Sequence, residues 1–124
     1  MFTRILHAND GSDHAFNALR LALRIAKKDA AELHMVSRET GPNTVRFDKT
    51  LQRARALAEE SHIDLRTHFR TGHPVHNVIK LAIDLNADLI VVGASGHSAL
   101  YDRMIGSRAQ KKLHHAMCPV LVVK

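Results

Sequence analysis

The sequence contains no tryptophan and few other aromatic residues, with four phenylalanines and one tyrosine among 124 residues. Proteins that bind single-stranded nucleic acid stack the bases on aromatic side chains, and this composition offers little for such a surface. The net charge of +6 and the pI near 10.0 favour contact with phosphate, but no expected helix carries an uninterrupted basic stripe. We therefore expect that nucleic acid is not the partner.

Cysteine occurs once, at Cys118, so the chain cannot form an internal disulfide. Because Cys118 precedes Pro119 and a strand of buried character, packing is favoured over nucleophilic chemistry. No apolar stretch approaches membrane-spanning length, and residues 1–7 lack the apolar run and small-residue cleavage site of a signal peptide. We expect a cytoplasmic protein that does not contact a membrane.

Strand and helix patterns alternate along the whole chain, which is typical of βαβ units and a parallel sheet. Strands are expected near residues 3–9, 32–37, 64–71, 89–92 and 120–123, and helices near 12–26, 47–58, 74–83 and 107–117. No linker or change of composition divides the chain. Residues 1–124 are therefore expected to form one α/β domain, a five-stranded parallel doubly wound sheet of order 3-2-1-4-5 flanked by four helices.

Each expected helix has an apolar face, and three of the four have a marked start. Ser12 caps the first helix, Pro74 begins the third, and Ser107 with Gln110 has capping-box spacing at the fourth. The apolar faces of the first three are Ala15, Phe16, Leu19, Ala22, Leu23 and Ala26; Phe47, Leu51, Ala54 and Ala58; and Val75, Val78, Ile79, Ala82 and Ile83. The third strand alternates apolar and polar residues, which predicts a half-exposed sheet edge, whereas the fourth and fifth are continuous apolar runs expected to be covered on both faces.

Small residues follow the first and fourth strands, at residues 9–12 and 93–96. In an open parallel sheet, ligands bind beyond the carboxyl ends of the strands, where the strand order reverses, and here that point lies between these two strands. Glycines let backbone N–H groups approach a phosphate, and a helix N-terminus adds donors. Gly93, Gly96, Gly106 and Ser107 supply both. Taken singly, each glycine also fits a turn and Ser107 a helix cap, so the prediction rests on their combination.

The spacing of these residues matches neither a Walker loop nor the Gly-x-Gly-x-x-Gly fingerprint of dinucleotide-binding proteins. Gly93, two residues, Gly96, nine residues and then Gly106-Ser107 resembles the nucleotide-binding motif of the universal stress proteins. Further landmarks resemble that family in the same order over essentially the whole chain, at residues 4–6, 10–12, 33–36, 72–74, 87–93 and 118–123.

The resemblance implies a Rossmann-like fold of the adenine nucleotide alpha hydrolase-like kind and a ligand such as ATP or AMP. It also implies that Ala8 and the backbone of Met35 line the adenine, and that Asp10 faces the nucleoside or holds Mg²⁺ together with the nucleotide. A turn before Gly11 explains Asp10 equally well, and both explanations stay open. Ala8 stands where some family members carry proline.

His97 and Arg108, which lie inside and beside the motif, are candidates for additional phosphate contacts. The expected function is that of a regulatory stress-response protein with little or no hydrolysis, because the sequence offers no convincing nucleophile or base. A slow ATP hydrolase and a nucleotide-independent partner module remain alternatives.

Two further expectations concern assembly and metals. An apolar strand at Val120–Val123 would leave an uncovered sheet edge, and family members commonly dimerise through this strand, so we expect a homodimer. The ten histidines include two close pairs, His73 with His76 and His114 with His115, and neither resembles a transition-metal site.

Overall fold

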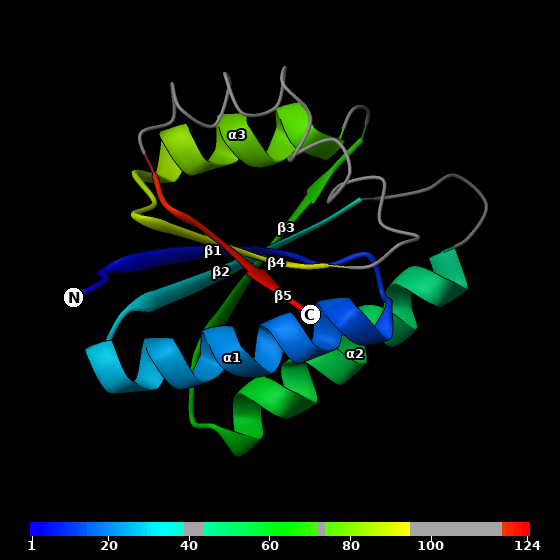
Figure 1. Ribbon diagram of the computed structural model, residues 1–124. Helices are drawn as coiled ribbons and strands as arrows, with labels where there is room; N and C mark the ends of the chain where they lie inside the picture. Colours follow the sequence, from blue (N-terminus) through cyan, green and yellow to red (C-terminus); the bar gives the residue numbers. More distant parts are fainter. Residues whose placement is uncertain (39–43, 72–73, 95–117) are drawn as a thin grey trace.

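The computed structural model describes residues 1–38, 44–71, 74–94 and 118–124. Its five strands form one parallel sheet of order β3-β2-β1-β4-β5, which confirms the predicted topology (Figure 1). The elements along the chain are β1 Arg4–Ala8, α1 Asp13–Asp29, β2 Glu32–Arg38, α2 Thr44–Glu60, β3 Leu65–Arg70, α3 Pro74–Leu85, β4 Leu89–Gly93 and β5 Val120–Val123. The fourth helix, expected from Ser107, lies outside the described residues.

The sheet is covered by helices on both faces, with α1 and α2 on one side and α3 on the other (Figure 1). Alternate residues of the central strands therefore enter two separate cores. One contains Ile5, Leu33, Met35 and Val91 with residues of α1 and α2, and the other contains Leu6, Val36, Ile90 and Val92 with residues of α3. This double burial explains why β4 is apolar at every position.

Helix α1 begins as the sequence predicts. The hydroxyl of Ser12 accepts a hydrogen bond from the N–H of Ala15 at 3.2 Å, which satisfies one of the unpaired donors of the first turn. All six residues predicted for its apolar face are buried. Helix α2 lies beside α1, and the guanidinium of Arg53 sits 4.0 Å from the centre of the Phe16 ring, a cation–π contact between the two helices.

Helix α3 begins at Pro74 as predicted, but one residue of its predicted face is wrong. Ile83 is 54% exposed, whereas Leu81 is buried. The buried stripe is centred on Val78 and Ala82, and a residue advances 100° around a helix from its neighbour. Ile83 therefore falls on the far side of the stripe from Leu81 and points away from the sheet.

The two outer strands differ in their cover. β3 is a half-exposed edge, as predicted, and Phe69 on it is 39% exposed. β5 forms the other edge, and its four residues are only partly buried. The prediction that the fourth and fifth strands are covered on both faces is confirmed for β4, whose residues are all buried. β5 is covered in part on both faces, since Leu121 and Val123 pack against the core beneath α1 and α2, and Val120 and Val122 pack against the core beneath α3.

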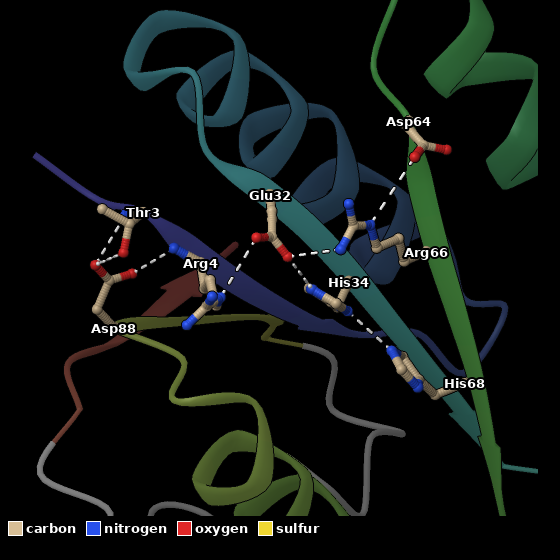
Figure 2. Close-up of polar contacts among 8 residues, drawn as sticks. All are labelled: Thr3, Arg4, Glu32, His34, Asp64, Arg66, His68 and Asp88. Atoms are coloured by element: carbon tan, nitrogen blue, oxygen red, sulfur yellow. Dashed lines mark hydrogen bonds and ion pairs between the residues drawn. The ribbon is translucent and has the colours of Figure 1, made fainter.

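The amino ends of β1 and β4 are joined by the carboxylate of Asp88 (Figure 2). It accepts hydrogen bonds from the N–H of Thr3 at 2.8 Å, the hydroxyl of Thr3 at 3.0 Å and the N–H of Arg4 at 3.0 Å. Partial burial raises the pKa of Asp88, but these hydrogen bonds outweigh it and the pKa lies below its ordinary value. In the described part of the chain, no helix is long and apolar enough to cross a membrane.

Candidate functional site

The carboxyl ends of the central strands lie together at one edge of the sheet, which is the edge where the strands end and not an edge formed by β3 or β5. The sequence predicted the ligand there. Ala8 of β1 pairs with Val36 of β2 on one side and with Val92 of β4 on the other. The chain then continues to Asp10 from β1 and to Gly93 from β4. The structure thereby brings Ala8, Asp10 and Gly93 to the same edge, at the point where the strand order reverses.

The turn between β1 and α1 is held by its own side chains. Oδ1 of Asn9 accepts from the N–H of Gly11 at 2.8 Å, and Oδ1 of Asp10 accepts from the N–H of Ser12 at 3.0 Å. Gly11 has φ of 86°, a left-handed conformation that favours glycine. Asp10 therefore has the turn role that the sequence left open, and its exposed side chain remains accessible for a second role.

Gly93 is required by the packing of α1 on β4. A Cβ atom at this position would lie 2.6 Å from the carbonyl carbon of His14, 2.7 Å from its oxygen and 2.8 Å from the nitrogen of Ala15. These are backbone atoms of the first turn of α1, which cannot yield as a flexible side chain can. The glycine that begins the motif thus has a structural reason that its spacing did not reveal.

Ala8 and Met35 lie on opposite faces of the sheet. Ala8 is 5% exposed in the core beneath α3, and Met35 is fully buried in the core beneath α1 and α2. Met35 pairs with His7 and Thr67, one residue before Val36 reaches the level of Ala8. The side chain of Met35 is therefore committed to the core, and the prediction for this residue concerns its backbone alone.

Buried polar side chains lie under this edge, and the sequence analysis did not identify their role. The hydroxyl of Ser37 donates to the carbonyl of Asn9 at 3.2 Å, and the N–H of Asn9 donates to the carbonyl of Val36 at 3.0 Å. These bonds fasten the end of β1 to the end of β2. Polar residues at the ends of apolar strands were the available signal.

His7 is fully buried in the middle of the sheet. Its Nδ1–H donates to the carbonyl of Val91 at 2.9 Å, so its Nε2 carries the lone pair. Burial lowers the pKa of His7 to about 4, although the bond to Val91 and the charge of Asp10 act in the opposite direction. His7 is therefore neutral at pH 7. Neither His7 Nε2 nor Asn9 Nδ2 has a hydrogen-bond partner in the described structure.

The predicted phosphate residues Gly96, His97, Gly106, Ser107 and Arg108 lie outside the described residues. The described part of the site is the side formed by β1 and β4. Within the described segments, no group of three or more histidine, cysteine or acidic residues is arranged to hold a metal ion.

Cys118 directly precedes the amino end of β5, so it lies at the opposite end of the strands from the candidate site. Burial and the nearby charge of Asp88 raise the pKa of its thiol to about 11, so the thiol stays protonated at pH 7. A protonated thiol is a poor nucleophile, in keeping with the packing role expected from the sequence.

Comparison with known proteins gives a consistent picture over the full length. The model of the universal stress protein family matches residues 1–124. Universal stress protein YxiE of Bacillus subtilis is 34% identical over 148 aligned residues that cover 100% of both chains.

Two solved structures have the same fold. A universal stress protein in complex with cAMP has a TM-score of 0.76 at 23% identity, covering 99% of this chain and 97% of that one. The universal stress protein from Archaeoglobus fulgidus in complex with dAMP has a TM-score of 0.73 at 20% identity, covering 100% and 98%. At these identities the similarity is one of fold.

Proposed function

This chain belongs to the universal stress protein family, and on that premise we propose that it is a regulatory protein that binds an adenine nucleotide at the carboxyl ends of β1 and β4. The observation that carries the proposal is the meeting of Ala8, Asp10 and Gly93 at the point where the strand order reverses. The same chain contains the complete Gly93, Gly96, Gly106-Ser107 spacing.

The nucleoside would contact β1 and β2. Ala8 would contribute mainly its backbone at the end of β1, since its side chain is 5% exposed, and the backbone of Met35 lies one residue before the partner of Ala8. The exposed carboxylate of Asp10 suits a ribose hydroxyl, which donates to it, or a Mg²⁺ ion held jointly with phosphate. Adenine is proposed because two proteins of the same fold bind cAMP and dAMP.

The phosphates would be held by backbone N–H groups at Gly96, Gly106 and Ser107, with His97 and Arg108 as additional donors. Gly93 contributes differently from the other glycines, because its missing side chain lets the first turn of α1 lie against the end of β4. In this proposal Gly93 shapes the edge, and the later glycines contact the ligand.

A binding protein of this kind needs no catalytic residue, and we propose little or no hydrolysis. Asp10 with Mg²⁺ could orient a water molecule, which keeps a slow ATP hydrolase as an alternative. A homodimer that pairs its β5 strands, and a cytoplasmic location where ATP is abundant, complete the proposal. A nucleotide-independent partner module is the alternative without a ligand.

The test is the thermal unfolding midpoint with ATP and Mg²⁺, with AMP, with GTP and without ligand. A nucleotide at about a hundred times its dissociation constant adds roughly 2.7 kcal/mol, which raises the midpoint of a domain this size by on the order of 10 °C. We expect this rise with adenine nucleotides only. Chromatography of the same samples for ADP separates binding from hydrolysis.

Three variants sharpen the test. Gly106→Val should abolish the rise, and Asp10→Asn should reduce it while keeping the Oδ1 acceptor that the Ser12 N–H needs. Asp84→Asn, at an exposed position on α3, is the matched control and should behave like the wild type. No rise with any nucleotide would contradict the proposal and favour the partner module.

A further inference from the structure

Two histidines on neighbouring strands form a hydrogen-bonded chain that the proposed function does not use. Nδ1 of His34 on β2 lies 2.9 Å from Nε2 of His68 on the edge strand β3, and Nε2 of His34 lies 3.1 Å from Oε1 of Glu32 (Figure 2). His34 is 4% exposed, so its two ring nitrogens depend on these partners. The chain spans two strands, at the outer edge of the sheet.

The direction of the chain follows from the carboxylate at its end. Ionised Glu32 only accepts hydrogen bonds, so Nε2 of His34 must carry the proton that it donates. In a neutral imidazole the other nitrogen then holds the lone pair, and Nδ1 of His34 accepts from the N–H of His68. The hydrogen bonds therefore run in one direction: His68 donates to His34, and His34 donates to Glu32.

Charged neighbours keep Glu32 ionised. The hydrogen bond from His34 and the charges of Arg66 and Arg4 lower the pKa of Glu32, although desolvation opposes them. Arg66 donates to Oε1 of Glu32 at 2.8 Å, and Nε of Arg4 lies 3.4 Å from Oε2. Burial, His34 and Arg70 lower the pKa of His68, so the His68 ring is neutral at pH 7.

The groups around the pair come from three strands and one helix. They are Arg4 from β1, Glu32 from β2, and Arg66 and Arg70 from β3; on α3, which covers this face of the sheet, the charged or titratable residues His76, Lys80 and Asp84 are exposed. Glu32 is the negative charge that contacts the pair, and the exposed carboxylate of Asp64, 3.9 Å from Nε of Arg66, is a second one beside three arginines. An additional positive charge on the pair is therefore poorly compensated.

The pair responds differently to a first and a second proton. The first binds Nδ1 of His68, which takes no part in the chain, and every hydrogen bond remains. The second can only go to Nδ1 of His34, where it meets the N–H of His68 at a nitrogen separation of 2.9 Å. It would also place two positive rings with centres 5.1 Å apart. The second proton therefore breaks the bond between the two strands.

We propose that the His34–His68 pair is an acid-sensitive link that holds the edge strand β3 on β2, intact with no or one added proton and broken by the second. With β3 detached, both histidines are exposed to water and each binds a proton. The form with β3 detached then holds one proton more than the form with β3 paired to β2. By linkage, the equilibrium constant for detachment of β3 rises up to tenfold per pH unit below about pH 6.

The test is hydrogen exchange of the β3 backbone amides, measured by NMR between about pH 7.5 and pH 5 and corrected for the intrinsic rate. We expect the protection of wild-type β3 to fall by up to tenfold per pH unit on the acid side, before that of β1 and β4. Protection of β3 that stays constant, or that falls only together with β1 and β4, would overturn the proposal.

His68→Gln separates titration from packing. The glutamine amide can donate its N–H to neutral His34 or, after flipping, offer its oxygen to protonated His34, so the link survives in either state. We expect β3 protection to change much less with pH in this variant and in His34→Gln, which also lacks the second site; burial and the charge of Arg70, which lower the pKa of His68, leave a smaller response in His34→Gln. His14→Gln, at an exposed position on α1, is the control and should keep the wild-type response. A wild-type acid response in both link variants would refute the assignment to this pair.

Discussion

At the scale of single residues, the burial of His7 makes the free energy of unfolding depend on pH. The unfolded chain binds a proton at His7 near pH 6.5, whereas the folded chain binds it near pH 4. Between these values the unfolded state holds one more proton, so stability falls as the pH falls, and above pH 6.5 His7 has no such effect. Between pH 6.5 and pH 4 the free energy of unfolding falls by roughly 3 kcal/mol through His7.

Replacing His7 by leucine should remove this dependence. The free energy of unfolding of the wild type, measured with urea, should drop between about pH 7.5 and pH 4.5 by roughly 2–3 kcal/mol more than that of His7→Leu. The variant also removes the unpartnered Nε2. His62→Gln changes an exposed histidine and should retain the wild-type drop. Equal drops in the wild type and His7→Leu would contradict this account.

At the scale of elements, the first turn of α1 and the end of β4 depend on each other through Gly93. An added methyl group would overlap backbone atoms of His14 and Ala15, so α1 must shift as a body. We expect Gly93→Ala to lower the free energy of unfolding by about 1–3 kcal/mol or more. Ser12→Ala removes only the N-cap hydrogen bond and should cost about 1 kcal/mol.

Chemical denaturation of the two variants gives the comparison. A Gly93→Ala cost below that of Ser12→Ala would mean that α1 and β4 are less closely packed than the structure indicates. Gly93 is not a suitable position at which to test nucleotide binding, since loss of binding there would follow from a displaced helix. Gly106→Val tests a later glycine of the motif instead.

The helices and strands were predictable because their apolar residues recur at clear helical or strand spacing. The apolar residues of α1 recur at helical spacing behind a clear cap, and β4 is apolar throughout because both of its faces are buried. The exposure of Ile83 was not predictable from spacing, since an apolar residue at the margin of a stripe can fall on either side of it. Only the placement of α3 on the sheet decides that.

The site was predictable in its position and less so in its detail. The alternating pattern predicts a parallel doubly wound sheet, and the order β3-β2-β1-β4-β5 of that sheet brings Ala8, Asp10 and Gly93 together. The contact of Gly93 with α1 depends on the distance between a helix and a strand, which no motif encodes. The bond between His34 and His68 depends on the register of β2 against β3, and their alternating patterns do not fix that register.

At the scale of the whole molecule, the two edge strands of the sheet differ in charge. β3 carries Arg66 and Arg70, charges that discourage another strand from pairing with it, whereas β5 has no charged residue. Pairing of two copies is therefore favoured at β5. This asymmetry supports the proposed homodimer and favours β5 over β3 as the strand through which it pairs.

Light scattering coupled to size-exclusion chromatography should show the wild type as a dimer. Val122→Arg places a charge on β5 and should shift the protein to the monomer, with circular dichroism confirming that the fold is kept. Ile83→Arg makes the same kind of change at an exposed apolar position on α3 and should remain dimeric. A monomeric wild type, or equal effects of the two variants, would contradict dimerisation through β5.

The central position of β1 also determines how the chain folds while it is being synthesised. β1 can pair with β2 once both have been made, but its other side can pair only after β4 has been made, and Asp88 must be made before it can bind Thr3 and Arg4. At about 5–20 residues per second, the ribosome needs several seconds to pass from β2 to β4. During that interval the first strand presents an apolar edge, so a nascent chain stalled between α2 and α3 should be a preferred substrate for chaperones.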